Sequence, residues 1–295
     1  MIRKINAYKI LKNIRNDEKK QISIIELDNK QFILKKVKVP DVNLINMLKN
    51  EVNILYKLKN TSLCPQLYWY NFSEDDNCII IELIKGETIN KLKLENTKQK
   101  VSLMLKILEA VKEIHKFNII HCDLKPDNIL LDLNNNIKII DFGISINNGE
   151  NYFLGHGTPR YCSKSQIIKK DIDFTTDIYS LGVIFYELLL GKSPFEGTKK
   201  EIVEKKKKSD YVKIDNVLLN LIFSKIFSDN ECKYNTIEDF EKDLELFLLR
   251  WNWNESLTIR LLKIQNLILP DKVEGTYRID ETEENGIKRG CYEIK

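Results

Sequence analysis

Hydrophobic residues follow two different periods along the chain, and the period changes near residue 85. In the first region, short apolar runs bounded by polar residues are typical of β-strands. The predicted strands are 8–14, 21–27 and 78–84. The turn sequence Asp28-Asn29-Lys30 also predicts a hairpin over 21–37. This region therefore predicts a small antiparallel sheet.

The same region contains one helical pattern. Apolar residues recur three or four positions apart between 41 and 59, after a plausible helix start at Pro40-Asp41. The chain then reaches its first glycine, Gly86, directly after the last predicted strand. Because glycine interrupts regular structure, we expect a hinge at 82–86.

Beyond this hinge the period is mostly helical. The predicted helices are 97–117, 177–190, 199–208, 215–227 and 236–250. The longest apolar run, at 181–190, contains Glu187 and is too short to cross a bilayer, so it predicts a buried helix. Residues 254–268 predict one more amphipathic helix, and the residues after Pro270 predict a tail.

These patterns predict an α+β fold with two lobes. Residues 1–84 form a small antiparallel β-rich lobe with one helix, residues 85–250 form a larger, mainly helical lobe, and residues 251–295 form a C-terminal extension of helix plus tail. Hydrophobic residues make up 43% of the chain, which is enough for a packed core and argues against a disordered protein.

Charge and cysteine content restrict the possible partners. Residues 1–38 hold eleven Lys or Arg against four Asp or Glu, which suits a phosphate-bearing ligand or an acidic partner, or simply a solvated surface. The basic run 199–208 lacks interleaved aromatic residues, so a nucleic-acid site is not expected there. The six cysteines are scattered, and the start of the chain has no apolar signal segment. Both features predict reduced thiols, a cytoplasmic protein and no membrane partner.

The candidate chemistry lies between residues 121 and 143. Residues 121–128 read His-Cys-Asp-Leu-Lys-Pro-Asp-Asn, and residues 141–143 read Asp-Phe-Gly after a predicted strand pair. Phosphoryl transfer needs a carboxylate near the attacking hydroxyl, oxygen ligands for a metal and cations for the phosphates. At this spacing the two segments resemble the catalytic loop and the metal-binding motif of the protein-kinase family.

The resemblance covers about residues 8–250. Residues 157–166 resemble the end of an activation segment, residues 177–182 the start of the central buried helix, and residues 191–197 the stretch that follows that helix. The chain thus resembles a divergent eukaryotic-type Ser/Thr protein kinase. This resemblance implies ATP and Mg²⁺ as cofactors and protein substrates that carry Ser or Thr hydroxyls, and it says nothing of the oligomeric state.

The resemblance assigns roles to single residues in the larger lobe. Asp123 would be the catalytic base, and Lys125 would contact the transferred phosphoryl group. Asn128 and Asp141 would be the magnesium ligands. Thr158 would lie between Asp123 and Lys125. Two further expectations are that Tyr161 lines the substrate groove and that Asp177 braces the backbone of the catalytic loop.

In the small lobe, Lys35 would bind the α- and β-phosphates and Glu51 would be its ion-pair partner. Lys36 is a rival, but strand alternation places it on the opposite face.

The adenine would lie at the hinge. Ile81 would be the gatekeeper, and backbone groups of Glu82 and Ile84 would bond the base. Further contacts with the nucleotide are expected from Ile33 and Leu130.

Three positions depart from the family. The phosphate loop near 15–22 reads Arg-Asn-Asp-Glu-Lys-Lys-Gln-Ile without glycine, so we expect weak nucleotide binding. Cys122 replaces the arginine that receives an activation-loop phosphate, so we expect activity independent of phosphorylation at 144–158. Ser165 replaces an acid, and its usual arginine partner appears as Lys233, which predicts a looser tie under the substrate groove.

Two alternatives remain open from the sequence. The missing glycines favour a pseudokinase scaffold with weak or no turnover. A small-molecule kinase of the aminoglycoside-phosphotransferase kind shares the loop motif, but the Asp-Phe-Gly, 157–161 and 177–182 segments argue against it because they build a peptide groove.

Overall fold

The computed structural model describes residues 8–149, 157–168, 172–228, 234–251, 277–284 and 287–294. By their internal contacts, residues 1–242 form one compact unit and residues 243–295 form a second. We describe the two units separately. No helix in the described ranges is long and apolar enough to cross a membrane.

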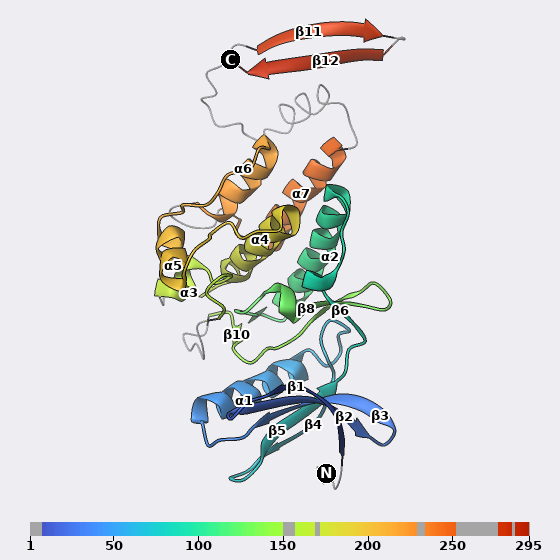
Figure 1. Ribbon diagram of the computed structural model, residues 1–295, viewed down its shortest axis with the longest axis vertical. Helices are drawn as coiled ribbons and strands as arrows, with labels where there is room; N and C mark the ends of the chain where they lie inside the picture. The colour runs from blue at the N-terminus through green and yellow to red at the C-terminus, as the bar shows by residue number, and fades with distance from the viewer. Residues whose placement is uncertain are drawn as a thin grey trace. The chain divides into compact units, whose positions relative to one another are not determined.

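The first unit begins with a five-stranded antiparallel sheet in the order β1-β2-β3-β5-β4 (Figure 1). Its strands are β1 (Lys9–Asn16), β2 (Lys20–Leu27), β3 (Lys30–Val37), β4 (Leu67–Phe72) and β5 (Asn77–Glu82). The three predicted strands are confirmed within about two residues at most ends. Strand β4 was not predicted, because it is an edge strand whose half-buried and exposed side chains alternate only in part.

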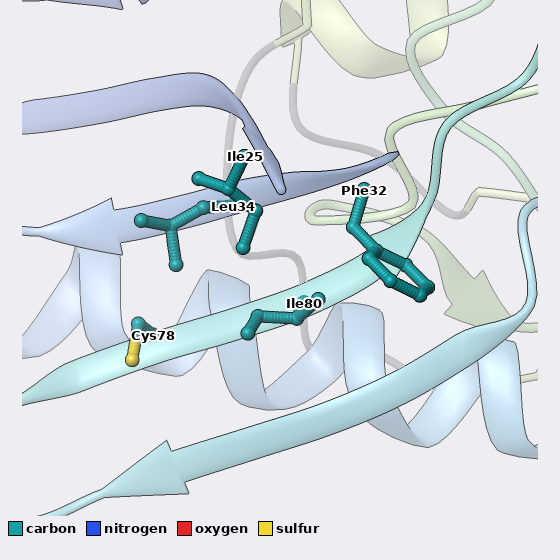
Figure 2. Packing of buried hydrophobic residues seen from close by; sticks show 5 residues of the cluster. All are labelled: Ile25, Phe32, Leu34, Cys78 and Ile80. Carbon is teal, nitrogen blue, oxygen red and sulfur yellow. The ribbon is translucent and has the colours of Figure 1, made fainter. Parts of the chain in front are cut away.

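Apolar side chains fill one face of this sheet (Figure 2). The buried cluster consists of Ile25, Phe32, Leu34, Cys78 and Ile80. Helix α1 (Val42–Lys57) contacts β4 and β5. It starts as predicted, because the Asp41 side chain accepts hydrogen bonds from the backbone amides of Asn43 and Leu44.

Small sheets connect this part to the helices. Beyond the connection 83–85 lies a three-stranded sheet in the order β6-β8-β9, and β7 pairs with β10. The bounds are β6 (Gly86–Thr88), β7 (Ile119–Ile120), β8 (Ile129–Asp132), β9 (Ile137–Ile139) and β10 (Ile146–Asn147). Two 3₁₀ helices, η1 (Ile89–Lys91) and η2 (Pro126–Asn128), flank β8 in space.

The other elements described up to residue 251 are helices. They are α2 (Thr97–His115), α3 (Lys164–Ile168), α4 (Thr175–Leu190), α5 (Lys199–Lys207), α6 (Val217–Ile226) and α7 (Ile237–Trp251). Helix α4 is buried continuously from Thr176 to Tyr186, as its apolar run predicts, and it lies against α2 (Figure 1). An antiparallel sheet followed by helices confirms the predicted α+β class.

The second unit contains a hairpin where the sequence analysis expected only a tail. Strands β11 (Tyr277–Glu284) and β12 (Ile287–Ile294) pair antiparallel along their full length, from Tyr277↔Ile294 to Glu284↔Ile287. The overlooked signal is the Asn-Gly pair at 285–286, a two-residue sequence that strongly favours hairpin turns. The helix predicted at 254–268 lies outside the described residues.

Gly182 allows α4 and α6 to approach closely. A Cβ atom at this position would lie 2.5 Å from Cγ2 of Ile226, which is far inside van der Waals contact. We expect Gly182→Ala to destabilise the fold by about 1–3 kcal/mol through overpacking. Urea unfolding of Gly182→Ala, Ile226→Ala and the double variant measures this effect. The loss of unfolding free energy in the double variant should be smaller than the sum of the losses in the two single variants. Strictly additive losses would contradict the close contact.

Candidate active site

A largely buried lysine, Lys35, with 13% of its side chain exposed, joins the sheet, α1 and the Asp-Phe-Gly segment. The Lys35 Nζ donates to Glu51 Oε1 at 2.7 Å, to Glu51 Oε2 at 3.0 Å and to Asp141 Oδ1 at 3.2 Å. The side chain of Glu51 is only 2% exposed, whereas that of Asp141 is 49% exposed. Lys36 instead pairs with Asp76 at 2.7 Å, as strand alternation predicts.

The charges in this cluster support one another. Burial disfavours the Lys35 ammonium, but the carboxylates of Asp141 and Glu51 outweigh burial and hold its pKa above the ordinary value. The Lys35 charge in turn lowers the pKa of Asp141 to about 2. Burial raises the pKa of Glu51, while Lys35 opposes that shift. Asp141 is therefore an anion that keeps half of its surface open to a ligand.

A second cluster surrounds Asp123. Its Oδ2 accepts from Lys125 Nζ at 2.6 Å, and its Oδ1 accepts from both the backbone amide and the hydroxyl of Thr158, at 2.9 and 2.8 Å. Lys125 Nζ also donates to Thr158 Oγ1 at 3.2 Å. Thr158 therefore lies between Asp123 and Lys125, where the sequence placed it. The cluster holds a carboxylate, a cation and a hydroxyl within hydrogen-bond distance.

Buried polar groups fix the backbone of this loop. Asp177, fully buried in α4, accepts from the amides of His121 and Cys122 at 2.8 and 3.0 Å, and it lies 2.9 Å from His115 Nε2. Burial opposes the ionisation of Asp177. The hydrogen bond from His115 and the charge of the His115 ring outweigh burial and hold the pKa of Asp177 below the usual value. The brace matters because Cys122 has φ 67°, a left-handed conformation that costs free energy for a residue with a side chain.

The His121 ring also positions Asp123. Its Nε2 lies 3.0 Å from the Ile140 carbonyl oxygen, so this nitrogen carries the hydrogen. Its Nδ1 then accepts from the Asp123 amide at 3.2 Å. The ring thereby connects the catalytic loop with the chain just before Asp141.

The oxygen atoms of Asn128 and Asp141 fit a magnesium ion in their chemistry. Asn128 Nδ2 donates to the Asp123 carbonyl oxygen at 2.9 Å, which leaves the amide oxygen available as a metal ligand. Mg²⁺ prefers oxygen ligands and keeps several waters or phosphate oxygens in its shell. The described part of the chain holds no group of three or more His, Cys, Asp or Glu that could hold a metal alone. These two residues therefore suit an ion that arrives with phosphates.

A cavity of about 320 Å³ opens between these clusters. Its lining includes the acidic residues Glu51, Asp123 and Asp141 and the basic residues Arg15, Lys20 and Lys35. Thr158 and the neighbouring Gly157 also line it. The cavity therefore presents cations and anions together, which suits a phosphate chain bound with a metal ion.

The residues expected at the adenine do not line this cavity. Ile33 pairs with Ile81 on adjacent strands, and Leu130 lies on β8. Glu82 ends β5 and uses its backbone amide for the carbonyl oxygen of Gln66, at 2.9 Å. Ile84 lies in the connection between β5 and β6. Of the predicted site residues, the cavity lining contains Lys35, Glu51, Asp123, Asp141 and Thr158. Lys125 and Asn128 contact Asp123 but do not line the cavity, and neither do the residues expected at the adenine.

The turn between β1 and β2 is closed by its own aspartate. Asp17 Oδ1 accepts from the amides of Lys19 and Lys20 at 2.9 and 2.8 Å, and Asp17 Oδ2 accepts from Arg15 Nε at 2.5 Å. The Lys20 amide and the Arg15 side chain lower the pKa of Asp17 to about 2. A carboxylate therefore occupies the amides that a glycine-rich loop would offer to phosphate.

Cys122 is a core residue. It packs with Ile120, Ile144 and Ile146, and burial raises the pKa of its thiol well above the ordinary value. Its carbonyl oxygen accepts from Gln166 Nε2 at 2.7 Å. The protonated thiol cannot bind a phosphate by charge, which agrees with the expectation from the sequence.

The segment after Thr158 meets α4 through Glu187. Arg160 Nε donates to Glu187 Oε1 at 2.5 Å, and the Tyr161 hydroxyl donates to Glu187 Oε2 at 2.8 Å. Ser165 lies in α3, half-buried. Lys233, its expected partner, lies outside the described residues.

Two functional contacts escaped the sequence analysis. Asn50 Nδ2 donates to the carbonyl oxygens of Phe142, Gly143 and Ser145, at 3.2, 3.2 and 2.7 Å. Gln166 binds the Cys122 carbonyl. In both cases the side chain and the carbonyl that it binds lie far apart in the sequence. Local spacing therefore gave no signal for Gln166. Asn50 could have been noticed only as the neighbour of Glu51.

Comparisons with known proteins agree with this geometry. A model of the protein kinase domain matches residues 7–265. An Aurora kinase of Dictyostelium discoideum is 32% identical over 185 residues, which cover 60% of this chain and 46% of the relative. A probable serine/threonine-protein kinase of Clostridium perfringens is 30% identical over 219 residues, which cover 68% of this chain and 32% of the relative.

A probable cAMP-dependent protein kinase catalytic subunit of Encephalitozoon cuniculi is 32% identical over 156 residues, which cover 52% of this chain and 48% of the relative. The chain spans about half or less of the length of these curated relatives. The family match extends past residue 250, where the resemblance read from the sequence ended. Because this match covers most of the chain, the chain belongs to the protein kinase family.

Proposed function

We propose that this chain transfers the γ-phosphoryl group of ATP to Ser or Thr hydroxyls of protein substrates. The observation that carries the proposal is the hydroxyl of Thr158, which donates to Asp123 Oδ1 at 2.8 Å and accepts from Lys125 Nζ at 3.2 Å. A substrate hydroxyl in the same position would meet a proton acceptor on one side and a cation on the other.

In the proposed reaction the substrate oxygen attacks the γ-phosphorus, and the bond to the β,γ-bridging oxygen breaks to release ADP. Asp123 orients the hydroxyl and accepts its proton. Lys125 balances charge on the transferred group, and Lys35 holds the α- and β-phosphates. When bound through Asn128 and Asp141, Mg²⁺ would neutralise charge on the phosphates.

The proposal includes the division of the chain and its ligand contacts. Residues 1–84 and 85–250 would be the two lobes, with residues 251–295 as an extension. The backbone of Glu82 and Ile84 would bond the adenine, with Ile33 and Leu130 against its faces. Among the described residues, the Ile84 amide forms no hydrogen bond, which supports this role.

A pseudokinase scaffold is the second candidate, and one observation favours it. Asp17 occupies two backbone amides at the phosphate loop and adds a negative charge there. The complete set of Lys35, Asp123, Asn128 and Asp141 argues for turnover, because a scaffold needs none of them for chemistry. An Asp123→Asn protein that retains the full biological role would decide for the scaffold.

We expect the purified protein to phosphorylate a generic protein substrate with labelled ATP and Mg²⁺. Asp123→Asn should lower the rate about 10²–10⁴-fold, because the proton acceptor is lost. Lys35→Met should lower the rate by a similar factor, because it removes the cation that would hold the phosphates and leaves Glu51 unpaired in the interior. Lys30→Met is the matched control on the same strand, since Lys30 is exposed and does not line the cavity. Phospho-amino-acid analysis should find phosphoserine or phosphothreonine, and wild-type rates in the Asp123→Asn variant would refute the proposal.

We expect weak ATP binding that improves when the carboxylate of the β1–β2 turn is removed. Asp17→Gly frees the amides of Lys19 and Lys20 and removes a negative charge near the phosphates, so the ATP dissociation constant should fall about 3–10-fold. Isothermal calorimetry measures it, with Asp28→Gly in the β2–β3 turn as the control. A sub-micromolar constant for the wild type, or unchanged binding in Asp17→Gly, would contradict the expectation.

We also expect activity without phosphorylation of residues 144–158, because Cys122 offers no charge to a phosphate. Phosphatase-treated protein should retain its rate within about twofold. Alanine substitution at Ser145 is a poor test, because Ser145 is buried and donates to the His121 carbonyl at 3.0 Å. Mass spectrometry should confirm the removal of phosphate. A loss of more than about tenfold on treatment would show that a phosphate orders the segment after all.

A further inference from the structure

Lys206 is a buried lysine outside the groups used so far. It lies in α5, next to the exposed Lys207, yet its own exposure is 0%. Its Nζ donates to the carbonyl oxygens of Arg160 at 2.8 Å and Cys162 at 2.7 Å. No carboxylate of the described residues forms an ion pair with it.

Aromatic rings complete its surroundings. The Nζ lies 5.0 Å from the ring centre of Tyr179 on α4 and 5.4 Å from that of Phe195. Such ring faces attract a cation. Burial lowers the pKa of Lys206 to about 7, and the Cys162 thiol and Glu187 carboxylate act weakly against this shift. A buried ammonium group is costly unless hydrogen bonds compensate it, so the two carbonyl contacts must hold their geometry closely.

The two carbonyls belong to a short segment next to Asp123. The amides of Tyr161 and Cys162 both donate to the Thr158 carbonyl oxygen, at 2.8 and 3.0 Å. Lys206 holds the same turn from the other side, through the carbonyls at 160 and 162. Its position therefore determines where Thr158 lies against Asp123 and where Tyr161 meets Glu187.

We propose that Lys206 is a positioning residue for protein substrates: by binding the carbonyls of Arg160 and Cys162 it holds segment 157–163 in the form that receives a substrate chain. This role rests on the proposed kinase function. Lys206 does not line the cavity, and its hydrogen bonds go to the carbonyls of Arg160 and Cys162 rather than to Asp123, so its effect should fall on the protein substrate and spare ATP.

Hydrogen exchange and steady-state kinetics test the proposal on the full chain. Lys206→Met keeps the length of the side chain but removes its donors, and Lys207→Met is the matched control on the same helix. In Lys206→Met, amides at 158–163 should exchange about tenfold faster, while those of α4 stay within about twofold. The KM for a protein substrate should rise about fivefold or more, with the KM for ATP unchanged within about twofold. Lys207→Met should match the wild type in all four measurements.

Three results would overturn the proposal. They are unchanged exchange at 158–163, equal acceleration of that segment and α4, and an equal rise of both KM values. If Lys206→Met shows no cooperative thermal transition, Lys206→Gln, which keeps one donor, is measured in the same way with the same criteria. A wild-type protein without phosphoryl transfer would refute the proposed function, whereas the exchange data would still decide whether Lys206 holds the segment.

Discussion

The arrangement of the candidate site depends on one buried carboxylate, Asp177. It lies inside α4, the most deeply buried helix of the first unit, and binds two consecutive amides of the loop that carries Asp123. His115 of α2 adds a third contact. A buried anion is stable only when its oxygens are satisfied, so the loop backbone cannot shift without exposing an uncompensated charge. This constraint keeps Cys122 in its left-handed conformation and sets the direction in which the Asp123 carboxylate points.

Around this fixed loop, the remaining groups approach from parts of the chain that are far apart. Lys35 and Glu51 come from the sheet and α1, Asp141 from the end of a small sheet, and Thr158 from the segment beyond. Opposite charges lie within hydrogen-bond distance in both clusters. In the first cluster, Lys35 and Asp141 stabilise each other's ionised form. The cavity between them is therefore preorganised for a ligand that carries charges of both signs.

The helices and the candidate site residues could be read from the sequence for different reasons, and the roles of the site residues stay predictions. Helices such as α2 and α4 have strong apolar periodicity, and Asp123, Asn128 and Asp141 stand in one contiguous stretch with a known spacing. Edge strand β4 has weak alternation and was missed. The hairpin of β11 and β12 carried a readable Asn-Gly signal that was overlooked.

Contacts between a side chain and a distant backbone carbonyl were beyond sequence reasoning. Asn50, Gln166 and Lys206 all bind carbonyl oxygens 40 or more positions away. Every residue has a carbonyl group, so no residue type marks the partner and no spacing predicts it. Asp17 is the opposite case, because it binds amides two and three positions ahead, and such local capture by Asp in a turn is readable.

The three carbonyl contacts of Asn50 have a mechanical consequence. Asn50 and Glu51 are neighbours on α1, and both connect this helix to residues 141–145. Glu51 is linked to Asp141 through Lys35, whereas Asn50 binds the backbone carbonyls at 142–145. Helix α1 therefore cannot swing away from the cavity by breaking the ion pair alone, because the amide contacts must break in the same movement. Displacement of this helix is a cooperative event, and intermediate positions would leave polar groups without partners.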